Sequence, residues 1–434
     1  MPTTPSYDAI VVGAGPAGTT AALAMAQKGL RVLLLERGES PGSKNMFGGM
    51  LAACAAPEEL IPGFWKQAPW ERHVVKRVLT VVGEGSSTSV VHQSDAADRE
   101  PYAGFTLYRP VFDRWYAERA RDAGVTLLCS CLVEGLVLRD GRVGGVRVAR
   151  PHGVIEAPLV VACDGVTSLL AKEAGLHAGF TPHQLALGVR ALFRLTEDEV
   201  DDRLGLSGLQ GATNEFLGCT DGVRGGGFVY SQVDTLSVGV VAHLDSLTQK
   251  RISPYDLLAR FVMSPWVAPL LKGARLAEYS AHLLPEGGIA MVPRLSAAGL
   301  LVAGDAAALC YTNGLTFEGM NLAMTSGKLA AETAIEALAS GDTSAAGLAS
   351  YEQRLRESYV IRDLKTWARA VDFMRRDQLF SAYPRMVGEL MERVYRSDGQ
   401  PKRRIGRHGL DVARESLPLR QLVRDGIAAG RSFL

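Results

Sequence analysis

Hydrophobic and polar positions follow two different periods near the start of the chain. Residues 7–12 form a largely apolar run rich in β-branched side chains, which is typical of a parallel strand buried on both faces. Residues 13–18 are a glycine-rich turn, and apolar residues at helical spacing then run from Thr19 to a glycine at position 29. A second apolar run, residues 31–35, ends on Glu36. This order predicts a βαβ unit with two neighbouring parallel strands.

Further elements follow from the same reading of the pattern. A glycine-rich loop without clear periodicity occupies residues 40–51, and residues 185–244 alternate as antiparallel strands do. The other predicted elements are a helix at 110–123, short strands at 125–129, 135–139, 143–149 and 154–163, a buried strand at 300–305, a long helix at 316–338, and a basic, helical tail from 351.

The change from alternating strands and helices to a run of antiparallel strands predicts how the chain is divided into domains. We expect an α/β fold with a dinucleotide-binding domain in two parts, residues 1–180 and 296–350. A second domain with a large antiparallel sheet is expected as an insertion at residues 181–295. Residues 351–434 are expected to form a helical C-terminal region.

Composition and charge narrow the classes of function. The 434 residues carry a net charge of +1 and a pI of about 7.7, so no nucleic-acid partner is expected. The six cysteines lack a C-x-x-C pair, so we expect neither a metal site nor an iron–sulfur cluster. The N-terminus does not resemble a secretory signal, and no window reaches the ~18 apolar residues of a membrane span. We expect a cytoplasmic protein, with any membrane contact peripheral, at the inner face of the cell membrane.

The first chemical motif is the turn Gly13-Ala14-Gly15-Pro16-Ala17-Gly18 between strand and helix. In such a turn the first glycine permits the tight bend, the second admits a pyrophosphate, and the third lets the helix pack on the strand. The helix N-terminus directs unpaired N–H groups at the phosphates, and Glu36 is placed to bind ribose hydroxyls. The motif predicts an adenine dinucleotide but leaves FAD and NAD open.

Two later motifs favour FAD. Gly304-Asp305, at the end of an apolar strand, resembles the motif of glutathione-reductase-like flavoproteins in which the aspartate binds the ribityl chain. Asp164-Gly165 resembles a motif of the aromatic-hydroxylase branch that turns the chain beneath the pyrophosphate. That branch usually has an arginine at the position of Ala171, so this chain departs from a standard aromatic hydroxylase.

Longer segments narrow the resemblance. Residues 35–51, 108–124, 278–288 and 303–332, with RHGL and RDG near the C-terminus, resemble the FixC-type branch of electron-transfer-flavoprotein:quinone oxidoreductases, which is related to the geranylgeranyl reductases. The resemblance implies a glutathione-reductase-like, FAD-binding Rossmann domain. The larger mitochondrial relatives carry a four-cysteine cluster domain, whereas this chain has no cysteine after Cys310.

The resemblance also implies roles for individual residues. Lys44, Asn45, Gly48 and Gly49 would line the flavin, Arg109 would lie near the FAD phosphates and Val133 near the adenine, and Gly319, Met320 and Asn321 would present backbone amides to the flavin edge. The motifs add Gly13, Gly15, Pro16, Ala17, Gly18, Glu36, Arg37, Asp164, Gly165, Gly304 and Asp305 to the expected cofactor site. No catalytic residue is predicted.

Two functions remain open at this stage. The first is an FAD enzyme that takes electrons from an electron-transfer flavoprotein and passes them to a quinone or a ferredoxin-like protein. The second is a flavin-dependent reductase, dehydrogenase or monooxygenase that acts on a lipid or biosynthetic intermediate, because one fold supports many activities.

Residues 255–271 and two histidines call for separate interpretations. The segment is apolar and is a candidate for membrane contact, but a helix pair packed on the sheet is the favoured interpretation. His282 and His243 are the histidines expected near a substrate cavity, although a core role is favoured for each.

Overall fold

The computed structural model describes residues 7–44, 49–151, 153–314 and 316–433. Within them a six-stranded sheet has the order β17-β18-β11-β1-β2-β7. Four of its five pairings are parallel, and β17 joins β18 as an antiparallel edge strand. The strands are β1 (Ala9–Val12), β2 (Val32–Leu35), β7 (Thr126–Leu128), β11 (Val160–Ala162), β17 (Ser296–Ala297) and β18 (Leu300–Val302). This sheet confirms the predicted Rossmann-type architecture.

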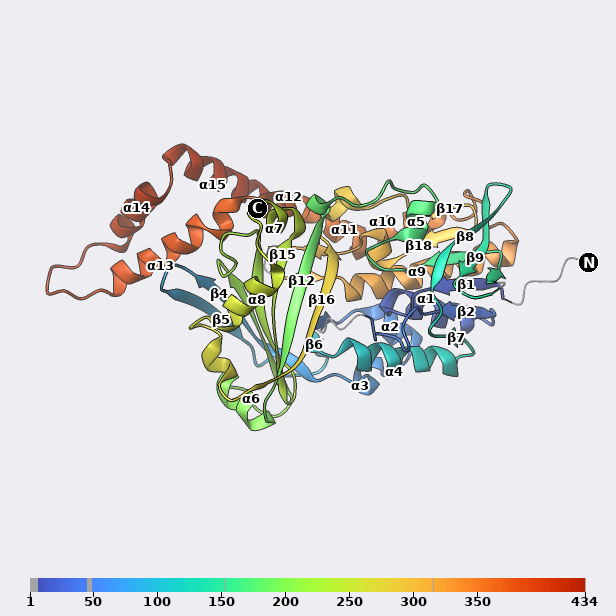
Figure 1. The fold of residues 1–434 in the computed structure, drawn as a ribbon, viewed down its shortest axis with the longest axis horizontal. Helices are drawn as coiled ribbons and strands as arrows, with labels where there is room; N and C mark the ends of the chain where they lie inside the picture. Colours follow the sequence, from blue (N-terminus) through green and yellow to red (C-terminus); the bar gives the residue numbers. More distant parts are fainter. Residues whose placement is uncertain (1–6, 45–48, 152, 315, 434) are drawn as a thin grey trace, which may run out of the picture.

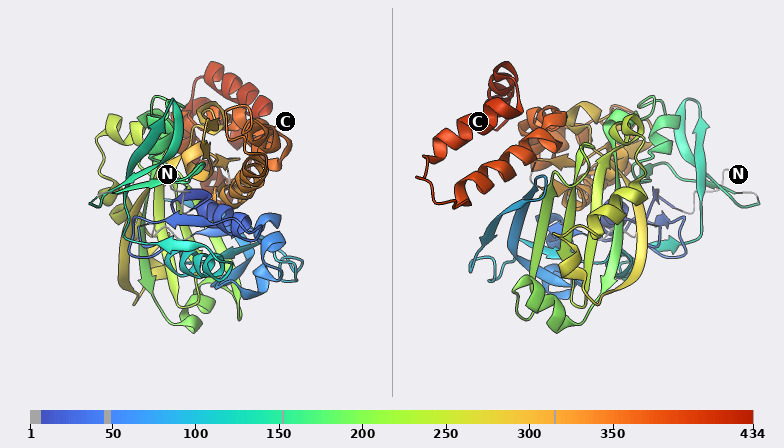
Figure 2. Two further views of the ribbon diagram at one scale, coloured as in Figure 1. Left: turned by 90° about the vertical axis from the view of Figure 1, so that its right-hand side faces the viewer. Right: turned by 60° about the vertical axis from the view of Figure 1, so that its left-hand side comes forward.

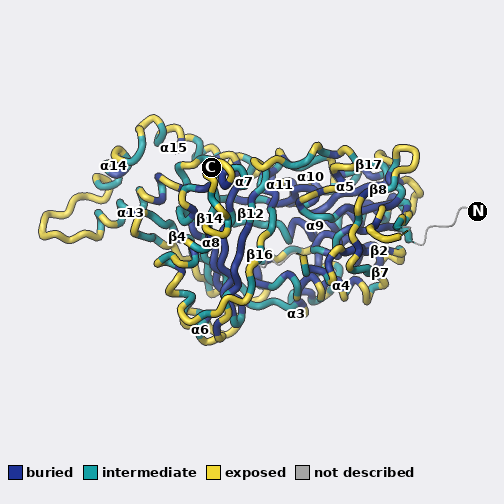
Figure 3. Tube along the Cα trace, viewed as in Figure 1, coloured by how far each residue is buried: buried dark blue, intermediate teal, exposed yellow. Residues whose placement is uncertain are grey.

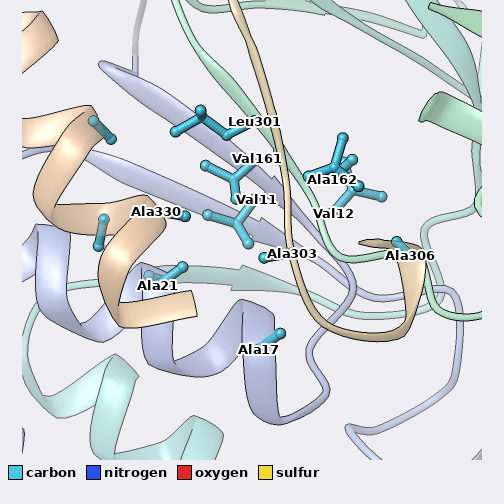
Figure 4. Packing of buried hydrophobic residues seen from close by; sticks show 14 of the residues in the cluster. Val11, Val12, Ala17, Ala21, Val161, Ala162, Leu301, Ala303, Ala306 and Ala330 are labelled. Carbon is cyan, nitrogen blue, oxygen red and sulfur yellow. The ribbon is translucent and has the colours of Figure 1, made fainter. Parts of the chain in front are cut away.

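Helices cover this sheet and close its core. The helices in this part of the molecule are α1 (Pro16–Ala26), α2 (Ala55–Leu60), α3 (Phe64–Gln67), α4 (Arg109–Asp122), α5 (Leu169–Glu173) and α9 (Met320–Ser340). Helix α1 starts earlier than predicted because Pro16 occupies its first turn, where proline needs no N–H partner. Small residues such as Ala17, Ala21 and Ala330 pack beside Val11 and Val161 of the strands (Figure 4). The sheet is therefore buried on both faces, as its apolar strands require.

The second sheet has nine strands within the described residues and stands beside the first (Figure 1). Its path is β16-β12-β15-β14-β13-β4-β6-β3, and β5 pairs with β4. The strands are β3 (Met50–Ala52), β4 (Arg72–Val82), β5 (Ser87–Gln93), β6 (Gly104–Thr106), β12 (Leu185–Arg194), β13 (Gln210–Leu217), β14 (Gly225–Ser231), β15 (Thr235–His243) and β16 (Arg275–Pro285).

This sheet corrects part of the predicted organisation. Strands β3 to β6 come from residues 50–106, so the large sheet is not built from residues 181–295 alone. The pairing of β4 with β13 is parallel, because a strand from the first part of the chain joins a meander formed much later. The segment predicted as a loop at 40–51 ends in β3. The pairing of β3 with β6 supplies the backbone hydrogen bonds of this strand, which the local sequence pattern did not predict.

The predicted strand at 154–163 is two strands. Strand β10 (Val154–Glu156) belongs to a small sheet with β9 (Arg142–Val148) and β8 (Val133–Arg139), whereas β11 belongs to the first sheet. Pro158 lies between them and has no N–H to donate to a ladder, which ends the pairing there. A short pair, β19 (Tyr311–Thr312) and β20 (Phe317–Glu318), precedes α9, which therefore begins at Met320 rather than at 316.

The outer face of the second sheet is covered by α6 (Glu197–Leu204), α7 (Leu244–Lys250) and α8 (Pro254–Val262). Helix α8 buries Leu257, Leu258 and Phe261 in the core of this sheet. The apolar part of residues 255–271 thus packs on the sheet, which was the favoured interpretation of that segment. Tyr255 and Met263, at the two ends of α8, remain exposed.

The C-terminal region is helical, as predicted (Figure 2). Its helices are α10 (Ser350–Glu357), α11 (Tyr359–Thr366), α12 (Ala368–Phe373), α13 (Ala382–Tyr395), α14 (Ile405–Ser416) and α15 (Leu419–Phe433). We call residues 382–433 the C-terminal arm. It extends beyond the second sheet, and Figure 3 shows that most of its trace is exposed or half-buried. No helix among the described residues combines the length and apolar character needed to cross a bilayer.

Candidate functional site

A long cavity of about 290 Å³ lies where the first sheet faces the second. The carboxyl ends of β1, β2, β11 and β18 all open onto it, which is the edge where α/β sheets bind ligands. Of the residues predicted from sequence, it is lined by Gly13, Gly15, Pro16, Ala17, Glu36, Arg37, Lys44, Gly49, Arg109, Val133, Asp164, Gly165, Asp305, Gly319 and Met320.

The three glycines of the turn after β1 have different surroundings. Gly13 and Gly18 lie against the protein's own backbone, whereas Gly15 borders open space in which a ligand can lie. Gly13 has a φ of +101°, and a Cβ there would lie 2.3 Å from the carbonyl oxygen of Cys163. A Cβ on Gly18 would lie 1.9 Å from the Gly13 oxygen, so this glycine serves the packing of α1 on β1. A Cβ on Gly15 would meet only the Arg109 guanidinium, at 3.6 Å. The space beside Gly15, at the N-terminus of α1, is where a pyrophosphate fits.

Glu36 is fixed by two backbone amides. Its Oε2 accepts a hydrogen bond from the N–H of Ala14 at 3.0 Å, and its Oε1 accepts one from Gly38 at 2.7 Å. The first bond ties the end of β2 to the glycine turn after β1. The carboxylate is therefore held at the cavity wall, where ribose hydroxyls would reach it.

Arg109 brings a positive charge to the cavity. It begins α4 and forms a two-pronged ion pair with Asp113, with N···O distances of 2.8 and 2.7 Å. Both residues are buried, and the pair holds the guanidinium beside Gly15. With Arg37 and Lys44 on the same wall, the donor set is cationic, as a dianionic diphosphate requires. Asp113 was not predicted, although its i,i+4 spacing from Arg109 on a helix was a usable signal.

Two aspartates that follow strands β11 and β18 also line the cavity, namely Asp164 and Asp305. Burial raises the pKa of Asp305, and the charge of Arg109 opposes that rise. Asp164 accepts a hydrogen bond from the N–H of Leu170 through Oδ2, at 3.1 Å. Its Oδ1 is buried and has no hydrogen-bond partner among the described residues. An unpartnered buried oxygen is costly, so a donor on a bound ligand fits this position.

The wall at the other end of the cavity lies around the start of α9. Gly319 is the N-cap of this helix, and a Cβ there would lie 2.8 Å from Cys310 Sγ and 3.9 Å from Asp305 Oδ1. The N-terminus of a long helix carries partial positive charge, which stabilises negative charge on a reduced flavin ring. The residues present thus fit FAD along the whole length of the cavity.

Some predicted residues do not line this cavity. Gly18 and Gly304 pack within the first domain, where a Cβ on Gly304 would lie 2.8 Å from Cβ of Ala17. Asn321 is buried, and its Nδ2 donates to Glu318 at 2.6 Å. The predictions for Asn45 and Gly48 fall outside the described residues.

The second sheet contributes cavity residues that sequence reasoning did not identify. Phe228 and Tyr230 of β14, Val241 of β15 and Leu284 of β16 line the cavity, together with Cys310 and Phe317 from the segment before α9. Only the register of the sheet brings these distant residues to one face.

The two candidate histidines have different surroundings. His282 of β16 lines the cavity, and burial lowers its pKa to about 4, so it is neutral near pH 7. His243 is buried, does not line the cavity, and lies 3.3 Å from Glu286. His282 therefore lies at the cavity, and His243 has the core position that was the favoured interpretation for both histidines.

Comparisons with known proteins agree with this geometry. Residues 8–180 match the family of FAD dependent oxidoreductases, and residues 370–434 match the ETF-QO/FixC family C-terminal domain. Among solved structures, a geranylgeranyl bacteriochlorophyll reductase-like protein from Thermoplasma acidophilum shares the fold, with a TM-score of 0.72, 21% identity, and coverage of 96% of this chain and 99% of that one. The fold and the site define an FAD-dependent oxidoreductase.

Full-length relatives narrow this class. The probable electron transfer flavoprotein-quinone oxidoreductase YdiS of Escherichia coli K12 is 39% identical over 97% of both chains. Protein FixC of the same strain is also 39% identical over 97% of both chains, and FixC of Bradyrhizobium diazoefficiens is 39% identical over 91% of this chain and 92% of its own. The chain belongs to the FixC and electron-transfer-flavoprotein:quinone oxidoreductase family.

Proposed function

We propose that this enzyme accepts electrons from an electron-transfer flavoprotein and passes them to a quinone or to a ferredoxin-like protein. The observation that carries the proposal is the apolar wall of the cavity formed by Phe228, Val241, Leu284 and Phe317. A flat, apolar acceptor such as a quinone ring fits against such a wall. The name of the relative YdiS, a probable electron transfer flavoprotein-quinone oxidoreductase, supports the same pair of partners.

Different residues of the chain would bind different parts of FAD along the cavity. Bound FAD supplies the chemistry of storing electrons and releasing them to the acceptor. Arg37, Lys44 and Arg109 would neutralise the diphosphate, and Glu36 would fix the ribose at the adenine end. The backbone amides at the start of α9, at Gly319 and Met320, would stabilise negative charge at the flavin end.

We also propose that the protein contacts an anionic lipid surface through the C-terminal arm. Residues 382–433 contain eleven lysines and arginines against six aspartates and glutamates. Large apolar side chains on α14 and α15 are exposed, namely Ile405, Leu410, Leu419, Val423, Ile427 and Phe433. Basic helices with an exposed apolar stripe bind lipid interfaces, which is where quinones are found.

Anaerobic rapid mixing tests the electron donor. The holoenzyme is mixed separately with a reduced electron-transfer flavoprotein, with NADH and with NADPH, while the loss of oxidised-flavin absorbance is followed. We expect fast reduction by the flavoprotein and slow or no reduction by either nicotinamide. The opposite pattern would favour the second function, a reductase or monooxygenase acting on a lipid or biosynthetic intermediate.

The acceptor is tested on holoenzyme that has been photoreduced without any protein donor. Mixing with a short-chain quinone, or with an oxidised ferredoxin, then reports which acceptor reoxidises the flavin. Reoxidation by neither acceptor would contradict the proposal.

A further inference from the structure

A row of polar side chains crosses the second sheet from its exposed edge to the cavity. His92 on β5 lies opposite Arg77 on β4, Arg77 lies opposite Thr213 on β13, and Thr213 lies opposite Tyr230 on β14. Directly opposed residues point to the same face of a sheet. His92 is exposed at one end of the row, and Tyr230 lines the cavity at the other.

Glu215 stands beside this row on the same face. It is two residues after Thr213 on β13 and lies opposite Phe228, whose ring stacks on Tyr230 with centroids 4.8 Å apart. Glu215 is therefore diagonal to both Tyr230 and Arg77, a separation that long side chains span. The residue as a whole is half-buried.

The electrostatic surroundings of Glu215 fit a proton donor. Burial raises the pKa of its carboxyl to about 7, and the nearby Arg77 opposes that rise. Burial also raises the pKa of the Tyr230 hydroxyl, which stays protonated. Arg77 is the charged group that lowers the pKa of Glu215, with a contribution from the Thr213 side chain, and Glu215 in turn raises the pKa of Tyr230. Helix α13 approaches this end of the sheet through the uncharged Pro384 and Gly388.

We propose that Glu215 is the proton source for a carbonyl-type acceptor, such as a quinone, that binds against Phe228 and Tyr230. The inference rests on the proposed function, because it assigns the proton that must accompany electron transfer. A quinone takes up two electrons from the reduced flavin and two protons to become a quinol. For each proton supplied here, Tyr230 gives its hydroxyl proton to a quinone oxygen and receives one from Glu215. The carboxylate left behind is stabilised by Arg77 and regains its proton from solvent.

The test follows the oxidation of photoreduced holoenzyme by a short-chain quinone as a function of pH. In the wild type we expect a rate that is constant below about pH 7 and falls above it, because the donor must be protonated. Glu215→Gln should remove this inflection and slow the oxidation about 100-fold below pH 7. Tyr230→Phe should slow it similarly, and Glu215→Asp should restore a pH-dependent rate. Reduction of each variant by an electron-transfer flavoprotein is measured in parallel, because slow reduction would report a disturbed flavin site rather than a missing proton.

Glu84→Gln is the matched control, because it makes the same chemical change at an exposed position between β4 and β5. A second measurement does not depend on turnover: the infrared band of a protonated carboxyl should titrate near pH 7 in the wild type and be missing in Glu215→Gln. An inflection that persists in Glu215→Gln, or a carboxyl band that does not titrate near pH 7, overturns the inference while the proposed function stands. A wild-type enzyme that no quinone oxidises removes the quinone branch of the proposed function, and the inference with it.

Discussion

Gly15 and Gly18 stand three residues apart, yet a methyl group added to each would meet different surroundings. At Gly18 it would collide with the Gly13 carbonyl oxygen, 1.9 Å away, whereas at Gly15 it would enter the space beside Arg109. We expect Gly18→Ala to lower the free energy of unfolding by about 3 kcal/mol or more, because α1 and β1 must separate.

Gly15→Ala should leave the thermal unfolding of the FAD-free protein close to that of the wild type, and should weaken FAD binding at least about 10-fold. Thermal unfolding with and without FAD, together with titration of the cofactor, measures both effects. Equal loss of stability in the two variants would show that Gly15 serves packing rather than the pyrophosphate.

Residues whose role depends on local geometry could be predicted from the sequence. Gly13, Glu36 and Asp305 each stand at the end of an apolar strand, and a strand, a turn and a helix in order are enough to place them at the carboxyl edge of the sheet. Phe228 and Tyr230 could not be found in this way. Their place in the cavity depends on the register of β14 against strands distant in sequence.

Helices α1 and α9 cross closely because small residues line their contact. A Cβ on Gly327 of α9 would lie 2.2 Å from the carbonyl oxygen of Ala17 in α1. We expect Gly327→Ala to destabilise the protein by about 2 kcal/mol and to loosen the FAD site, since α1 carries the glycine turn. Gly409→Ala is the control, because nothing lies within 4 Å of its Cβ.

At Gly409, in the middle of α14, alanine should raise stability slightly, by up to about 1 kcal/mol. Denaturant unfolding followed by circular dichroism measures both changes. A Gly327→Ala protein as stable as the wild type would mean that the two helices can shift apart without cost.

The elements of the first sheet follow from the sequence more fully than those of the second. Strands β1, β2 and β18 are continuous apolar runs with clear ends, whereas β3 and β6 have three residues each and gain their hydrogen bonds only by pairing with each other and with β4. Short strands that are not part of a longer apolar run carry too little periodicity for a local pattern to identify. Their assignment to the second sheet needed the long-range pairing of β4 with β13.

The placement of apolar surface on the whole molecule differs from what residue composition suggested. The apolar segment 255–271 buries its leucines against the second sheet, whereas the basic tail holds the exposed apolar stripe. Along α15, Leu419, Val423 and Ile427 recur every four residues and so lie on one face of the helix. Periodicity within the tail could have shown this stripe, but only the tertiary structure shows that nothing else in the described chain covers it.

The proposed lipid contact predicts how the whole molecule distributes between solution and vesicles. The holoenzyme should sediment with vesicles rich in phosphatidylglycerol, less with pure phosphatidylcholine, and less again at high salt, because arginines next to the stripe attract anionic headgroups. Replacing Leu419, Val423 and Ile427 together by glutamine should weaken this binding at least about 10-fold while leaving the flavin spectrum unchanged. The control replaces the exposed Tyr255 and Met263 by glutamine and should bind as the wild type does. If the control loses binding and the variant of α15 keeps it, contact runs through residues 255–271 and the C-terminal arm serves another partner.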